Sequence, residues 1–221
     1  MRVFLALLLL AGPASAGVWT KTGPDTMSFK GGIDIGEYDR FALVFGPSIK
    51  EIVVDSEGGV TFEGIRIAHA IAAQNVKVVV TGECLSSCAN YLFVAGHQRE
   101  IRGGVVGYHG NVQACFGTPA KRAEWIEKMK NHYHMTPEDI RRNLEAQDKE
   151  VADEARLLSM MGVSQGLFER SCTNDKGMGD GKSYAFLLPK RATFEKYGLW
   201  GIVGEQDPAV MRTRAWPYVH D

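Results

Sequence analysis

Short apolar runs alternate with stretches of helical periodicity along the chain from about residue 26 onward. Runs of β-branched and aromatic residues predict strands, and apolar residues that recur three and four positions apart predict helices. The predicted strands are 27–29, 41–45, 52–55, 77–80, 105–108 and 184–188. The predicted helices are 67 to about 75, 88–95, a turn at 193–197, and two helices between 119 and 161 that a Thr136-Pro137 N-cap signature separates.

The order strand, helix, strand, helix is typical of βαβ units and therefore of an α/β fold. Such units build a mostly parallel sheet that is covered on both faces. The carboxyl ends of parallel strands lie at one edge of the sheet, where ligands bind in open α/β folds. Residues that follow these strands are therefore the candidates for a functional site.

Three turns at this edge carry side chains or backbone groups that could take part in a reaction. Gly58 and Gly59 follow one strand and can present bare N–H groups, because glycine permits close approach. Ser86 and Ser87 stand at a predicted helix start, where unpaired N–H groups favour negative charge. His109 follows the next strand. A nucleophile, a base and oxyanion donors are thus expected to converge.

The N-terminus has the pattern of a secretory signal peptide. Arg2 precedes a short apolar run, and Ala14-Ser15-Ala16 forms an A-x-A cleavage site. A membrane-spanning helix needs about 20 apolar residues, and this run is shorter, which disfavours the rival interpretation of an uncleaved anchor. We expect a signal peptide at 1–16, a single domain at 17–221, no membrane span after cleavage, and a periplasmic or secreted protein.

Composition and charge narrow the choice of partners. The 25 basic and 26 acidic side chains nearly cancel, and 45% of the 221 residues are hydrophobic, so neither a nucleic-acid-binding arm nor a disordered chain is indicated. No Gly-rich phosphate loop or dinucleotide fingerprint occurs, so no ATP, dinucleotide or other cofactor is expected.

The four cysteines are expected to pair outside the cytosol, and three pairings are possible. Their spacing contains no C-x-x-C pair, and His132 and His134 point apart on a helix, so no metal site is predicted. A thiol-active protein that uses Cys84 and Cys88 remains an alternative, because a helix start stabilises a thiolate.

Taken together, these motifs resemble a known family. The series S-E-G-G at 56–59, G-E-C-L-S-S-C at 82–88, A-G at 95–96, the strand before His109 and E-K-Y-G-L at 195–199 is similar to the proteolytic subunit of Clp protease, in the crotonase-like superfamily. The match is best with an exported bacterial branch that carries C-L-S-S-C. The resemblance implies repeated β-β-α units, a serine peptidase acting on peptides or proteins, and a homo-oligomer. Without an ATP motif, the peptidase would be ATP-independent.

Two serines compete for the role of nucleophile in this resemblance. Counting four residues on from Gly82 gives Ser86, and counting nine back from Gly96 gives Ser87. A loop tolerates an extra residue better than a packed helix does, so the sequence favours Ser87. The oxyanion donors would then be the N–H groups of Cys88 and of Gly58 or Gly59, with His109 as general base.

The family's third catalytic residue has no match in this sequence. The position of its aspartate, about a dozen residues before Gly198, is occupied by Phe186. Asp175, Asp180, Glu83 or a backbone carbonyl could substitute for it. A catalytically silent binding or assembly module of the same fold is therefore the second hypothesis.

Overall fold

The computed structural model describes residues 17–171, 185–213 and 218–220. Within them, one seven-stranded sheet has the order β1-β2-β3-β4-β5-β8, with β6 also paired to β4, and every pair except β1–β2 is parallel. The strands of this sheet are β1 Val18–Lys21, β2 Thr26–Lys30, β3 Glu51–Ser56, β4 Lys77–Leu85, β5 Gln98–Ile101, β6 Val105–Gly107 and β8 Ile202–Gly204. A second, two-stranded parallel sheet joins β7 Phe186–Leu188 to β9 Tyr218–His220. The fold is mixed α/β with a mostly parallel sheet, as the sequence pattern predicts.

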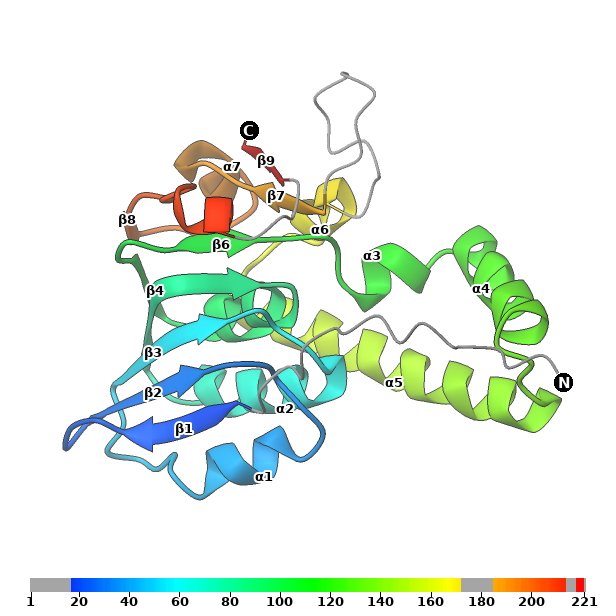
Figure 1. Cartoon of the computed structure of the whole chain (residues 1–221), viewed down its shortest axis with the longest axis horizontal. Coiled ribbons are helices and arrows are strands. Elements are labelled where there is room, and N and C mark those ends of the chain that lie inside the picture. The colour runs from blue at the N-terminus through cyan, green and yellow to red at the C-terminus, as the bar shows by residue number, and fades with distance from the viewer. Residues whose placement is uncertain (1–16, 172–184, 214–217, 221) are drawn as a thin grey trace, which may run out of the picture.

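Helices pack against this sheet, and two of them extend away from it. The helices are α1 Glu37–Ala42, α2 Thr61–Ala72, the π-helix η1 Cys88–Phe93, α3 Val112–Phe116, α4 Pro119–Asn131, α5 Pro137–Met161, α6 Gly166–Ser171, α7 Arg191–Lys196 and the 3₁₀-helix η2 Val210–Thr213. Figure 1 shows α5 passing behind the sheet beside α2 and continuing outward to meet α4. We call α4 and the outer part of α5, residues 119–149, the arm.

The break between α4 and α5 lies where the sequence predicts it. The Thr136 hydroxyl accepts a hydrogen bond from the Asp139 N–H at 3.2 Å, and Pro137 occupies the first turn. Proline is tolerated there because its missing N–H would have no helical partner. The cap confirms the prediction of two helices.

The predicted strand at 41–45 is wrong, because these residues end α1 and form the turn after it. Phe41 and Phe45 are four residues apart and stack with ring centroids 4.4 Å apart, a contact that helical spacing produces. Phe41 also packs edge-on against Trp19 at 4.9 Å. A short apolar run fits either element, and here tertiary packing selects the helix.

Strand β4 changes its neighbour halfway along its length. Its first part, 77–80, pairs with β5, and its last part, 83–85, pairs with β6. The register against β3 shifts between Val54 and Ser56, which marks a bulge. The strand therefore continues beyond Gly82, where the sequence predicts its end, and its carboxyl end lies directly beside β6.

The core between the sheet and its helices is apolar. Helix α2 buries Ile65, Ile67, Ala68 and Ile71, and every residue of η1 is buried. Full burial of a large aliphatic side chain contributes about 1.5–3 kcal/mol to stability, so these helices are firmly held. The elements that follow β3 and β4 therefore form a rigid support for the edge of the sheet.

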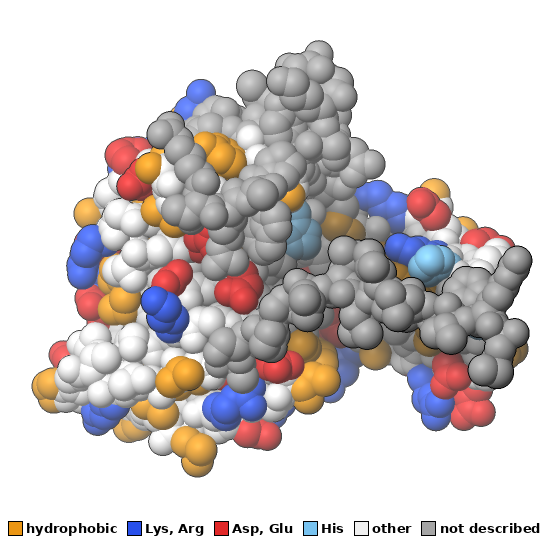
Figure 2. Space-filling view, in the orientation of Figure 1, with side chains coloured by type: hydrophobic (Ala, Val, Ile, Leu, Met, Phe, Trp, Pro, Cys, Tyr) orange, Lys and Arg blue, Asp and Glu red, His pale blue; other side chains and the backbone are white. Residues whose placement is uncertain are grey.

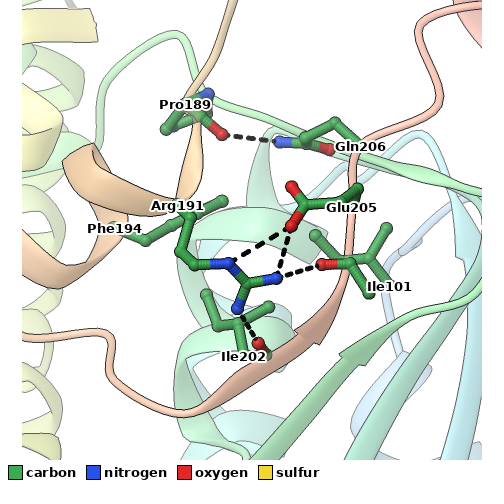
Figure 3. Close-up of a pocket in the computed structure, with 8 residues that line it drawn as sticks. Ile101, Pro189, Arg191, Phe194, Ile202, Glu205 and Gln206 are labelled. Carbon is green, nitrogen blue, oxygen red and sulfur yellow. Dashed lines mark hydrogen bonds and ion pairs between the residues drawn. The ribbon is translucent and has the colours of Figure 1, made fainter.

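Arg191 and Gln206 form a cluster of hydrogen bonds around α7 and β8, and Figure 3 shows the bonds of Arg191 and the one from Gln206 to the Pro189 carbonyl. The Arg191 guanidinium donates to the carbonyl oxygens of Ile202 and Gly204 and to Glu205 Oε1. Gln206 exchanges two hydrogen bonds with the backbone of Val106 in β6, at 2.7 and 3.0 Å. The cavity there measures about 10 Å³, room for one water molecule at most. The hydrogen bonds around this small cavity hold β6 in place.

On the face shown in Figure 2, acidic and basic side chains are interspersed over the described surface. This mixture agrees with the near-zero net charge and indicates no stripe of one sign on that face. Among the residues that the structure describes, none of the helices combines the length and the apolar character needed to cross a membrane.

Candidate active site

Ser86 and His109 meet at the carboxyl edge of the sheet. Ser86 follows β4 and His109 lies two residues beyond β6, so adjacent parallel strands bring them together. The Ser86 Oγ and His109 Nε2 atoms are 2.6 Å apart, within hydrogen-bonding distance. The convergence of a hydroxyl and an imidazole, which the sequence predicts for this edge, is present in the structure.

The backbone of Ser86 forms a sharp turn between the strand and the helix. Its φ of 54° lies in the left-handed region, which costs a non-glycine residue about 1–2 kcal/mol. The Ser86 N–H donates to the Gly107 carbonyl at 3.0 Å, and the Ser86 carbonyl accepts from the Asn90 N–H at 2.8 Å. The first bond ties the serine directly to β6. A strained turn that exposes a serine above a strand end is also the arrangement of the nucleophile in α/β-hydrolases.

Ser87, the serine that the sequence favours, points elsewhere. Its side chain is 1% exposed, and its hydroxyl donates to the Gly59 carbonyl at 2.7 Å. The geometry therefore contradicts the expectation that Ser87 lies beside His109. The reason lies in η1, which is a π-helix and not an α-helix. The counts from Gly82 and from Gly96 differ by one residue, and we expect this extra residue in the loop. A π-helix accommodates one extra residue, so the extra residue lies within the helix instead.

The glycine turn packs directly beneath the serine turn. Gly58 has a φ of 88°, and a Cβ placed on it would lie 2.4 Å from the Leu85 carbonyl oxygen and 2.7 Å from the Ser87 nitrogen. Gly59 has a φ of 145°, and a Cβ there would overlap the Ile33 carbonyl oxygen. Only glycine fits this close approach. Gly58 and Gly59 thus lie where the sequence expects the oxyanion turn, although the Gly58 N–H itself donates to Ser56 Oγ at 3.1 Å.

The change of serine also changes the second expected oxyanion donor. With Ser86 beside the imidazole, the N–H that follows it belongs to Ser87, and Cys88 lies one residue further into the helix. Cys88 is fully buried. The Ser87 N–H therefore replaces the Cys88 N–H as the candidate donor.

A disulfide between Cys84 and Cys88 brackets the two serines. Cys115 is disulfide-bonded as well, and Cys172 lies outside the described residues. Because both sulfurs of the C-L-S-S-C motif are joined, neither is available as a thiolate nucleophile in this state. The bond instead closes a short loop around Ser86.

The His109 ring is exposed and contacts Phe186. The two rings are edge to face, with centroids 5.5 Å apart. Phe186 is the residue that the motif count places where the Clp proteolytic subunit has its aspartate. Of the possible substitutes, Glu83 is buried and its N–H donates to Asp55 Oδ1, while Asp175 and Asp180 lie outside the described residues.

The segment that follows His109 is anchored by hydrogen bonds. The Asn90 side chain donates to the Gly110 carbonyl at 2.7 Å. Asn111 caps α3 by accepting from the Ala114 N–H, and it exchanges two side-chain hydrogen bonds with Gln165. His109 therefore projects from a backbone that is fixed on its carboxyl side.

One buried group near this site is not apparent from the sequence. Glu154 of α5 accepts hydrogen bonds from the Tyr91 hydroxyl and from two N–H groups of α3. Burial raises the pKa of the Glu154 carboxyl, and burial together with the nearby carboxylate raises the pKa of Tyr91. The charged pattern of α5 predicts an exposed face, and no signal in the sequence alone distinguishes this glutamate from its neighbours.

Among the described residues, no group of three His, Cys, Asp or Glu side chains could hold a metal ion. His132 and His134 are both exposed at the end of α4.

No family model matches the chain, and no curated protein matches it in sequence. Solved structures similar to it include enoyl-CoA hydratases. The structure from Mycobacterium avium has a TM-score of 0.39 at 10% identity and covers 90% of this chain and 74% of its own. The structure from Mycobacterium avium subsp. paratuberculosis K-10 has a TM-score of 0.32 at 15% identity. The match covers 50% of this chain and 62% of that one.

A probable enoyl-CoA hydratase/isomerase from Mycobacterium abscessus has a TM-score of 0.33 at 6% identity, covering 48% of this chain and 59% of its own. The match therefore spans less than two thirds of the length of this relative and of the paratuberculosis one. Likenesses with TM-scores below 0.5 say nothing about the activity of this chain.

Proposed function

We propose that this protein is an exported serine hydrolase, an ATP-independent peptidase in which Ser86 is the nucleophile and His109 the general base. The observation that carries the proposal is the 2.6 Å separation between Ser86 Oγ and His109 Nε2. Hydrogen-bond contact between a hydroxyl and a base is the geometric requirement for an activated serine. The left-handed turn at Ser86 and the glycine turn packed below it support the same role.

In this mechanism the neutral imidazole accepts the Ser86 proton at Nε2 while Oγ attacks the substrate carbonyl. The N–H of Ser87 and an N–H of the Gly58–Gly59 turn stabilise the resulting oxyanion. The imidazolium then donates its proton to the leaving amine, and an acyl-enzyme forms. A water molecule, deprotonated by His109, hydrolyses the ester and restores the free serine.

Substrate, assembly and location rest on the sequence. A peptide or protein substrate and a homo-oligomer follow from the resemblance to the Clp proteolytic subunit, and the pattern of residues 1–16 supports export to the periplasm or secretion. Fusion of residues 1–16 to a reporter that is active only outside the cytosol tests the export.

Labelling with a fluorophosphonate probe tests the reaction, because the probe modifies only an activated serine. We expect the wild-type chain to be labelled and both Ser86→Ala and His109→Ala to lose at least about 10³-fold in labelling rate. Ser87→Ala is the matched control, since its hydroxyl binds the Gly59 carbonyl and not the imidazole. It should keep a labelling rate close to that of the wild type.

Two results would contradict the assignment. Labelling that persists in Ser86→Ala and disappears in Ser87→Ala would move the nucleophile to Ser87. A folded wild-type chain that is not labelled at all would remove the hydrolase.

The second candidate is a catalytically silent, crotonase-like binding or assembly module. Phe186 favours it, because an aromatic ring lies 5.5 Å from the imidazole at the position where the family's aspartate is expected. A phenyl ring cannot accept the imidazole N–H or stabilise an imidazolium as a carboxylate does. Loss of this carboxylate from a chymotrypsin-type triad lowers the rate about 10⁴-fold. The labelling experiment distinguishes the two candidates.

A further inference from the structure

One buried carboxylate connects the two parts of the chain that carry the candidate catalytic residues. Glu154 is 1% exposed and lies in the inner half of α5. It accepts the Tyr91 hydroxyl, the Val112 N–H at 3.0 Å and the Gln113 N–H at 2.9 Å. A buried carboxylate is costly unless donors surround it, and these three donors offset part of that cost.

The donors come from two separate elements. Tyr91 belongs to η1, the helix that begins immediately after the serine turn. Val112 and Gln113 form the start of α3, three and four residues after His109. A single side chain of a third element thus holds the serine-bearing helix and the histidine-bearing segment at a fixed separation.

Other hydrogen bonds near the site each join only two of these elements. The Asn90 side chain of η1 donates to the Gly110 carbonyl, and this bond does not involve α3. Asn111 and Gln165 hold the start of α3 to the segment before α6 and do not reach η1. The imidazole is exposed and contacts Ser86 and Phe186, and the backbone that carries it sets how closely it can approach the serine.

We propose that Glu154 is a positioning residue that sets the distance between Ser86 and His109 by binding Tyr91 and the first turn of α3 together. The inference rests on the proposed function for its kinetic consequence, but its structural consequence can be measured without any reaction. A glutamine at this position has one acceptor oxygen and one NH₂ group, so at least one of the three donors loses its partner.

The test compares Glu154→Gln with Glu150→Gln. Glu150 lies one turn earlier in the same helix, is half-buried, and accepts the Thr61 hydroxyl of α2 at 2.5 Å. Burial raises the pKa of both carboxyls, so the two substitutions are matched in chemistry and in helix. We expect Glu154→Gln to lower the fluorophosphonate labelling rate about 10–100-fold, as a 1 Å misplacement does. Glu150→Gln should lower the rate far less than Glu154→Gln does, since its carboxylate bonds Thr61 of α2 and no donor of η1 or α3.

The second readout is the imidazole itself. In NMR spectra, the His109 ring resonances should shift in Glu154→Gln and remain unchanged in Glu150→Gln, because the hydrogen bond to Ser86 changes only in the first. A general loss of stability would not shift the His109 resonances selectively in Glu154→Gln. If the wild-type chain is not labelled, the proposed function fails, and the NMR comparison alone then decides the positioning role.

Tyr91→Phe covers the case in which Glu154→Gln does not fold. It removes only the hydroxyl that links Glu154 to η1, and it should produce a smaller change of the same kind in labelling rate and in the His109 resonances. Wild-type resonances and rate in a folded Glu154→Gln, or in Tyr91→Phe if the first variant is unfolded, would overturn the inference.

Discussion

At the scale of single residues, the site depends on positions where only one residue type fits. Ser86 has a left-handed φ, and the space beneath its turn is filled by the backbone of Gly58. Ser86, the proposed nucleophile, is therefore held by backbone packing as well as by hydrogen bonds. Strain of this kind is tolerated only where the surrounding structure fixes it firmly.

Gly58→Ala tests this packing. The new Cβ would overlap the Leu85 carbonyl oxygen and the Ser87 nitrogen, both of which belong to the backbone and cannot move aside. We expect a loss of about 1–2 kcal/mol from the positive φ and a further 1–3 kcal/mol, roughly, from overpacking. Chemical denaturation measures the free energy of unfolding.

Gly162→Ala is the matched control for that substitution. Gly162 has a φ of 67°, but a Cβ there meets nothing within 4 Å. It should cost only the backbone part, about 1–2 kcal/mol. Equal losses in the two variants would show that the close approach of the glycine turn contributes nothing.

The sequence places a serine and His109 at one edge, but it favours Ser87 as the partner of His109, whereas Ser86 is the serine that contacts it. The order of strands and turns is enough to bring a serine and His109 to one edge, because parallel strands always end on the same side. The choice between Ser86 and Ser87 depends on how the next helix is wound, and the π-helix η1 shifts the count by one residue. No hydrophobic pattern reveals a π-helix whose residues are all buried.

At the scale of elements, the turn between β4 and η1 is closed by the Cys84–Cys88 disulfide. Opening this bond removes the covalent closure of the turn and leaves the left-handed conformation of Ser86 to the hydrogen bonds of its backbone and to packing. The disulfide is therefore expected to contribute to the site and not only to stability.

Cys84→Ala/Cys88→Ala tests this expectation without disturbing the other bridge. Closing a loop of about five residues is worth about 2 kcal/mol of chain entropy, so the midpoint of urea unfolding should fall accordingly. We also expect a labelling rate at least about tenfold lower than that of the wild type. Unchanged labelling in this less stable variant would show that the left-handed turn holds without the disulfide.

Two elements show where pattern-based prediction stops. The run at 41–45 has the composition of a strand, and only the packing of Phe41 against Trp19 and Phe45 shows that it ends a helix. Helix α5 is predicted correctly as a helix, and its charged face is exposed at Arg141, Glu145 and Lys149, but Glu154 on that face is buried among donors from distant segments. Both errors arise from tertiary contacts that local periodicity cannot encode.

At the scale of the whole molecule, α5 joins two regions of different packing. Its inner part carries the buried residues Glu154, Leu157 and Leu158 and packs on the core beside α2. Its outer part and α4 form the arm, in which Met129 and Ile140 are the buried residues. Exposed ion pairs such as Arg122–Asp148 link the two helices of the arm, and such pairs contribute about 0–1 kcal/mol each.

Hydrogen exchange should therefore divide α5 at about residue 150. In a dilute sample that sediments as a monomer, we expect amides in 119–147 to exchange at least about tenfold faster than those in 150–161. Local opening costs less where few apolar groups are buried. Mass spectrometry of peptic fragments measures both regions in one experiment. Equal protection in the monomer would contradict this division. Protection of the arm that rises with protein concentration would instead identify it as the surface through which copies of the chain assemble.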